Sequence, residues 1–237
     1  MTLPRRAILQ TLLSTMCAGA GLAGGLLHAA PQAESRVASR PPDAAEVTRF
    51  FRAVQLDDAK TVAAMIGSVV NANQLNPLGG EPGLVLAIRE DAMRVAQVFL
   101  DHPGTSLETK AINGNTALMM AAFKRNREAV EKLLARGAKL NQPGWTALHY
   151  AAAAGDDEIV RILLARGAKI DALSPRASGA YTPLMMAARE GQDGTAVLLI
   201  KQGAKAALKN GEGLNAEQLA ERAGKPRVAR AIREAAN

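Results

Sequence analysis

The chain has 237 residues, a formal net charge of +7 and one cysteine, so a scaffold held together by disulfide bonds is excluded. Hydrophobic residues make up 48% and charged residues 22%, as in an ordinary globular protein, but aromatic residues make up only 3%. A core with so few rings is built from Ala, Leu, Val, Ile and Met, which favours closely packed helices over a β-sandwich or barrel. We therefore expect an all-α protein.

The first 30 residues differ from the rest of the chain. Arg5 and Arg6 precede a run without charges from residue 7 to residue 30, which is the pattern of an export signal. The stretch "RRAILQ" resembles the twin-arginine export motif but departs from it at several positions, so the general secretory route stays open. A run of this length can also span a bilayer of about 30 Å, so a retained membrane anchor is the alternative.

We expect residues 1–30 to be a signal peptide, residues 31–45 to be a flexible linker rich in Pro, Ala and Ser, and residues 46–237 to form the folded domain. Cys17 lies in the first segment, so the exported product would have no thiol.

Loss of the two arginines of the first segment lowers the net charge from +7 to +5. Six basic residues, more than this surplus, lie at or just after expected helix C-termini, where the helix dipole stabilises cations. They are Arg136, Lys139, Arg166, Lys169, Lys201 and Lys205. The charge therefore predicts no nucleic-acid partner.

From residue 46 onward the sequence repeats one pattern about every 33 residues. Six segments align on one alanine each: Ala53, Ala87, Ala121, Ala151, Ala187 and Ala220. Such a period is typical of a solenoid with one helix-turn-helix unit per repeat, because each unit must bury its apolar face against its neighbours. The spacing is shortest before Trp145 and longest after it.

Three central units share the same start and stop signals. A threonine precedes each apolar run, where its hydroxyl would cap the helix, and a glycine follows the second helix, where a left-handed residue is wanted. The threonines are Thr116, Thr146 and Thr182, and the glycines are Gly137, Gly167 and Gly203. Pro183 stands at a first helical position, where its missing N–H does no harm.

The stretches "TALMMAAF", "TALHYAAAAGD" and "TPLMMAAREG" resemble the ankyrin repeat, whose pattern contains T-P-L-H-x-A-A and a terminal Leu-Leu-x-x-Gly-Ala. The resemblance runs from about residue 46 to residue 237 and departs at Arg125, which stands where the pattern has a glycine. It implies an ankyrin-repeat solenoid of about six helix-turn-helix units joined by projecting hairpin loops.

The sequence shows no set of residues suited to catalysis. The folded part has only His102 and His149, without a second metal ligand at a suitable spacing, and it contains no nucleotide-binding or nucleophile motif. The acids of residues 156–158 open a helix, where its dipole stabilises them. We expect no enzymatic activity, no cofactor and no metal ion. The resemblance implies that His149 ties adjacent loops together, and the rings of Phe50, Phe51, Phe99 and Tyr150 fit core or cap positions.

The resemblance also implies where a partner would bind. The contact positions are the residue before the capping threonine and the two residues after the Ala-Ala pair. In the three strong repeats they are Asn115, Phe123 and Lys124, then Trp145, Ala153 and Ala154, then Tyr181, Arg189 and Glu190. Trp, Tyr and Arg often dominate binding energy, but Trp145 has the alternative of packing on its neighbouring hairpin to stiffen it.

We therefore expect a monomeric scaffold or accessory subunit in the bacterial periplasm, which binds an unidentified partner protein through a concave groove and hairpin tips. A membrane is expected to take part only if the N-terminal segment is retained. The alternatives are a membrane-tethered structural spacer and, from the resemblance alone, an accessory factor of an oxidative-defence enzyme.

Overall fold

The computed structural model describes residues 41–236, so the expected signal peptide and most of the expected linker lie outside the described residues. The described residues fall into two compact units, 41–139 and 140–236. Within them there are twelve α-helices, one short 3-10 helix and no β-strand. The all-α prediction is confirmed.

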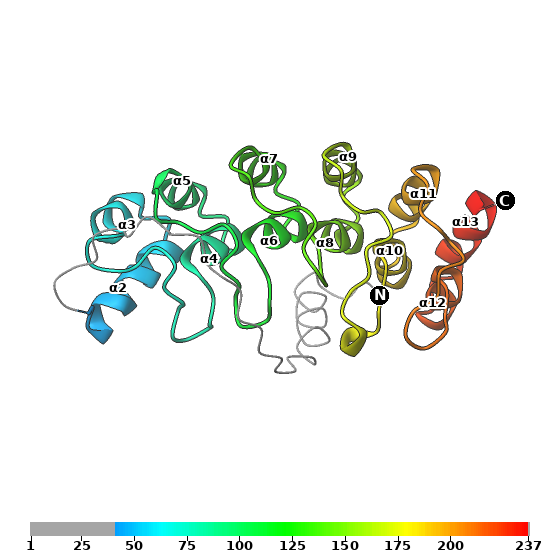
Figure 1. Ribbon diagram of the computed structural model, residues 1–237, viewed down its shortest axis with the longest axis horizontal. Coiled ribbons are helices and arrows are strands. Elements are labelled where there is room, and N and C mark those ends of the chain that lie inside the picture. Colours follow the sequence, from blue (N-terminus) through cyan, green and yellow to red (C-terminus); the bar gives the residue numbers. More distant parts are fainter. Residues whose placement is uncertain (1–40, 237) are drawn as a thin grey trace. The chain divides into compact units, whose positions relative to one another are not determined.

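The unit of residues 41–139 contains three helix pairs (Figure 1). The pairs are α2 (Ala44–Gln55) with α3 (Ala59–Met65), α4 (Gly83–Arg89) with α5 (Met93–Asp101), and α6 (Ala117–Phe123) with α7 (Arg127–Ala135). The first helices, α2, α4 and α6, pack side by side in what we call the inner row, and α3 packs against α5 in the outer row. Long hairpins lead into α4 and α6.

The unit of residues 140–236 repeats this arrangement. Its pairs are α8 (Ala147–Ala154) with α9 (Asp157–Ala165), α10 (Pro183–Glu190) with α11 (Asp193–Lys201), and α12 (Ala216–Arg222) with α13 (Pro226–Ala236). Helix α10 lies between α8 and α12 in the inner row, and α11 lies between α9 and α13 in the outer row. The short helix η1 (Arg176–Ser178) lies in the loop before α10.

The expected helix caps at Thr116 and Thr182 are present. The hydroxyl of Thr116 accepts from the amide of Met119 at 3.5 Å, and that of Thr182 accepts from Met185 at 3.2 Å. Pro183 is the first residue of α10, as predicted. The third of these helices, α8, likewise begins directly after its threonine, Thr146.

The domain begins earlier than residue 46. The carboxylate of Asp43 accepts from the amide of Glu46 at 2.8 Å, and the Glu46 carboxylate accepts from the amide of Asp43 at 3.0 Å. This reciprocal cap starts α2 at Ala44. Residues 44 and 45 therefore belong to the first helix and not to the linker.

The six aligned alanines lie in the core, where their small side chains let neighbouring helices of each unit approach closely. Their exposed fractions are 6% for Ala53 and 0% for Ala87, Ala121, Ala151, Ala187 and Ala220. The core assignments of Phe50, Phe51, Phe99 and Tyr150 are also confirmed. The Phe50 and Phe99 rings meet edge to face, with centroids 6.0 Å apart.

The turn between the two helices of a pair needs a left-handed residue. The later repeats use glycine there, at Gly155, Gly191 and Gly224, but the first three use Asp57 (φ 53°), Asp91 (φ 57°) and Arg125 (φ 58°). A non-glycine residue in this conformation costs about 1 kcal/mol or more. Asp57 offsets this cost by accepting from Arg94 Nε at 2.8 Å and from the amide of Val95 at 2.9 Å. Arg125, which stands where the family pattern has a glycine, thus takes the left-handed conformation that this position needs.

Candidate protein-binding surfaces

Two hairpins of the unit 41–139 meet at their tips. The first, residues 75–82, is closed by a bond from the amide of Asn76 to the carbonyl of Glu81 at 2.8 Å. The second, residues 111–115, is closed by a bond from the amide of Ala111 to the carbonyl of Asn115 at 2.9 Å. The amide of Ile112 donates to the carbonyl of Gly80 at 2.8 Å, which joins the two tips.

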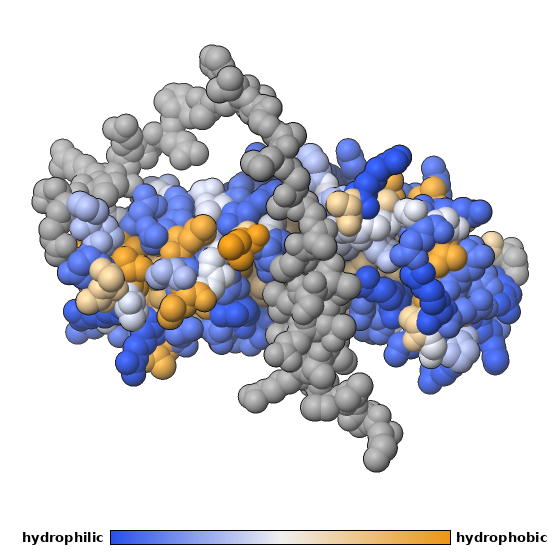
Figure 2. Space-filling model, turned by 90° about the horizontal axis from the view of Figure 1, so that it is seen from below, coloured by the Kyte–Doolittle hydropathy of each residue, from blue (hydrophilic) through white to orange (hydrophobic). Residues whose placement is uncertain are grey.

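These tips present apolar side chains to solvent. Leu78 is 90% exposed, Ile112 is 85% exposed and Leu75 is 39% exposed. We call these three residues the hairpin-tip patch, and Figure 2 shows hydrophobic residues gathered on this side of the unit. A Cβ on Gly80 would lie 2.8 Å from Cβ of Ile112. The two hairpins can therefore approach this closely only because residue 80 is a glycine. Exposed apolar side chains that cluster mark candidate interaction sites.

The predicted contact residues of this unit differ in accessibility. Asn115 is only 5% exposed, and its amide donates to the side-chain oxygen of Asn113 at 3.1 Å, so it belongs to the framework of the hairpin. Phe123 and Lys124 are half-buried at the end of α6. The ammonium of Lys124 lies 3.3 Å from the carboxylate of Asp91 in the neighbouring turn.

The second repeat carries a charged cluster at the same positions, which the sequence reasoning missed. Arg89 Nη2 lies 3.1 Å from Glu81 Oε2 and 2.9 Å from Glu90 Oε1. Burial raises the pKa of Glu81, and the positive charge of Arg89 opposes this shift. Glu81 and Arg89 occupy the same positions in the second repeat as Asn115 and Phe123 occupy in the third. They were not predicted as contact residues because the second repeat matches the family pattern more weakly.

In the unit 140–236, Trp145 packs against its own repeat. Its ring meets those of His149 and Tyr150 edge to face, with centroids 5.2 Å and 6.3 Å apart. The side chain is half-buried, and its Nε1 atom is buried without a hydrogen-bond partner. Both rings belong to α8 of its own repeat, so packing of Trp145 on the neighbouring hairpin and its contact with a partner protein both stay predictions.

Tyr181 and Arg189 form one cluster. Tyr181 is 7% exposed, and the Arg189 guanidinium lies 5.1 Å from the centre of its ring, as in a cation–π contact. Arg189 Nε also donates to Glu190 Oε1 at 2.9 Å. Tyr181 is buried because the long loop before it folds back: its amide donates to the hydroxyl of Ser174 at 2.9 Å. Arg189 and Glu190 are half-buried and present the polar edge of this cluster.

His149 of the same unit is held by hydrogen bonds at both ring nitrogens. Its Nδ1 accepts from the amide of Thr146 at 3.2 Å, which leaves Nε2 as the protonated nitrogen that donates to the carbonyl of Tyr181 at 3.0 Å. Burial lowers the pKa of His149 from 6.5 to about 4, although the bond to the Tyr181 carbonyl opposes the shift. The predicted tie between adjacent loops is confirmed, because this ring joins the start of α8 to the loop before α10.

Residues 41–236 contain no cluster of metal ligands and no membrane-spanning helix. No three His, Cys, Asp or Glu side chains come close enough together there to hold a metal ion. No helix in this part of the chain is long and apolar enough to cross a membrane.

A family model of three consecutive ankyrin repeats matches the chain over residues 50–143, 84–174 and 139–210. These overlapping matches cover well over half of the sequence and include the repeats whose caps, alanines and loop-tying histidine are described above. The chain belongs to the ankyrin repeat family.

Proposed function

We propose that this chain is an exported scaffold or accessory subunit without enzymatic activity, which binds a partner protein through its hairpin tips and the inner row of helices. Ankyrin repeats generally mediate protein–protein interaction. The observation that carries the proposal is the hairpin-tip patch, where Leu78 and Ile112 are almost fully exposed on neighbouring hairpins.

Burial of the hairpin-tip patch would contribute substantially to the free energy of binding. Full burial of one Leu or Ile side chain stabilises a complex by about 1.5–3 kcal/mol, so two such side chains supply about 3–6 kcal/mol before ordering costs. The patch alone is small. A partner that also covers the end of α6 would meet Phe123 and the Lys124 ammonium, whose contact with Asp91 holds it in place.

The unit 140–236 offers a different kind of surface. Arg189 is positioned by both Tyr181 and Glu190, so little side-chain entropy is lost when a partner contacts it. Such held polar groups set the register and specificity of binding more than its affinity.

Residues 1–30 support a periplasmic location. Arg5 and Arg6 followed by an uncharged run have the composition of an export signal. Cell fractionation with N-terminal sequencing tests this location. A shortened chain in the periplasm supports it, and an intact chain in the membrane fraction favours the tethered spacer instead.

The binding proposal is tested with Leu78→Asp combined with Ile112→Asp. Wild-type chain is used to capture proteins from periplasmic extract, and the dissociation constant of each captured protein is then measured by calorimetry for every variant. We expect at least about a hundredfold weaker binding for the double variant, because two apolar anchors become charged. Its melting temperature should not change, because both side chains are exposed.

Leu173→Asp is the matched control. Leu173 is 51% exposed on a loop of the other unit, so this variant adds a similar charge to a similar side chain outside the patch. It should bind as the wild type does. Equal affinity of the double variant and the wild type would show that the hairpin-tip patch is not the binding surface.

A further inference from the structure

The methionines of the described residues differ sharply in accessibility. Five of the six are buried: Met65 at 8% exposed, Met119 at 2%, Met120 at 4%, Met185 at 1% and Met186 at 0%. Met93, the first residue of α5, is partly exposed. Since oxidation of a methionine requires access to its sulfur, Met93 is the candidate for modification among residues 41–236.

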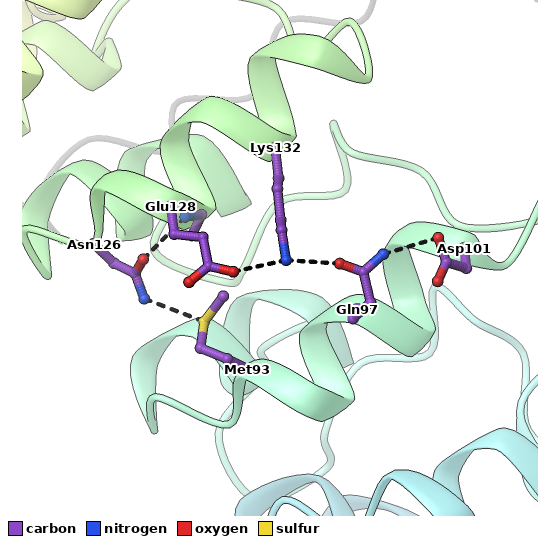
Figure 3. A network of polar contacts seen from close by, with 7 residues as sticks. Met93, Gln97, Asp101, Asn126, Glu128 and Lys132 are labelled. Carbon is purple, nitrogen blue, oxygen red and sulfur yellow. Dashed lines mark hydrogen bonds and ion pairs between the residues drawn. The ribbon is translucent and has the colours of Figure 1, made fainter.

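Met93 belongs to a polar network between α5 and α7, shown in Figure 3. The side-chain nitrogen of Asn126 points at the Met93 sulfur and lies 3.1 Å from it. Further along the same helices, Lys132 lies between Glu128, at 2.8 Å, and the side-chain oxygen of Gln97, at 2.9 Å. The sulfur is thus held beside an amide donor within an ordered network.

The orientation of the Asn126 amide is fixed by helix capping. Its Oδ1 accepts from the amide of Ala129 at 2.9 Å, which caps α7. Because the oxygen is committed to the cap, the NH₂ group must face Met93. The contact between the Asn126 NH₂ group and the Met93 sulfur therefore follows from the helix cap.

A thioether sulfur has two lone pairs, and oxidation at one or the other gives two sulfoxide epimers. The N–H of Asn126 points at one lone pair, so an oxidant reaches the other more easily. We propose that Met93 is a peroxide-reactive methionine whose oxidation is directed by Asn126 toward one sulfoxide epimer.

The reaction is balanced with hydrogen peroxide as oxidant. The free lone pair of the Met93 sulfur attacks one peroxide oxygen, and the O–O bond breaks. The leaving hydroxide takes the proton from the oxygen that is now bound to sulfur and departs as water. Sulfur is oxidised from thioether to sulfoxide and the peroxide is reduced. The two epimers are repaired by two different classes of reductase, so the choice of epimer also determines which enzyme restores Met93.

The test is peroxide treatment of the folded full chain followed by trypsin digestion and mass spectrometry. Met93 falls in the five-residue peptide "EDAMR", which contains no other methionine. Chromatography of this peptide, with each reductase class as a stereochemical check, gives the ratio of the epimers. We expect Met93 to react at least about ten times faster than any of the five buried methionines, with an epimer ratio of about 3:1 or more.

Asn126→Asp is the informative variant. An aspartate still accepts from the amide of Ala129 and caps α7, but it has no N–H to direct at the sulfur. We expect rapid oxidation of Met93 with an epimer ratio near 1:1. Met93→Leu, which keeps the apolar side chain, should leave the peptide unmodified and serves as the reference for the assay.

Three results would overturn the proposal. A buried methionine that reacts as fast as Met93 would show that solvent exposure does not determine which methionine is oxidised. A wild-type ratio near 1:1, or a skewed ratio that persists in Asn126→Asp, would show that Asn126 does not direct the reaction. Circular dichroism of each variant confirms that the comparison is made on folded protein.

Discussion

A single buried imidazole makes one unit of this protein sensitive to acid. His149 is fully buried in its neutral form, with both ring nitrogens committed to protein partners. Its folded-state pKa of about 4 lies below the ordinary value of 6.5. The unfolded chain therefore takes up a proton at a pH where the folded chain does not, and stability falls as the pH falls from about 6.5 to about 4.

The loss attributable to His149 over this range is about 3 kcal/mol, and it levels off below pH 4, where both states are protonated. Urea unfolding of wild type and His149→Gln between pH 7 and pH 4 measures it. Glutamine does not titrate, so the variant should be less stable at pH 7 and lose less stability on acidification. Parallel pH profiles would contradict the role assigned to His149, since all other titrating groups are common to both proteins.

At the scale of helices, two glycines should respond in opposite ways to the same substitution. Gly83 begins α4, and a Cβ there would overlap the ring of Phe99. Gly194 lies in α11, and a Cβ there would meet only Asp157 Oδ2, at an ordinary contact distance of 3.7 Å. Alanine normally stabilises a helix relative to glycine, but not where it collides with the core.

We expect Gly194→Ala to stabilise the protein by about 0.5–1 kcal/mol and Gly83→Ala to destabilise it by about 1–3 kcal/mol. Denaturant unfolding measures both free energies. Combining Gly83→Ala with Phe99→Leu should cost less than the sum of the two single changes, because the smaller side chain relieves the overlap. A stabilising Gly83→Ala would show that the α4–α5 contact is looser than described.

At the scale of the whole molecule, repeat proteins are stabilised mainly by contacts between neighbouring repeats, so we expect damage at one end to stay local. Ile232 of α13 is 1% exposed, and α13 packs on α11 and α12. Ile232→Ala should cost about 2–5 kcal/mol. Hydrogen exchange should show lost protection in α11, α12 and α13, while α2 to α5 keep theirs. Arg230→Ala, at an exposed position of the same helix, is the control, and a uniform loss of protection would indicate one cooperative unit.

The repeat architecture was predictable from the sequence because period, capping residues and core positions all agree. Thr116, Thr182 and Pro183 start helices as expected, and the glycines that follow the second helices have positive φ angles. His149 also does what its place in the pattern implies.

The surface was harder to predict, because a repeat pattern specifies backbone positions and not exposure. Tyr181 is buried by a loop that folds back through Ser174, a tertiary contact that periodicity does not reveal. Leu78 and Ile112 are residue types that are usually buried, yet both are exposed here. The hydrogen bond between the two hairpins, which the sequence does not reveal, brings them onto one surface. Trp145 has the residue type of a binding anchor and yet packs on rings of its own repeat.

The left-handed turns have a consequence for the order of the repeats. In the unit 41–139, Asp57 pairs with Arg94 of the next repeat and Asp91 pairs with Lys124. In the unit 140–236, the turn at Gly155 is covered by Gln192. Each of these three turns thus lies against a side chain of the repeat that follows it. Exchanging these repeats would separate Asp57 from Arg94 and Asp91 from Lys124, so these modules are similar in backbone but not interchangeable in sequence.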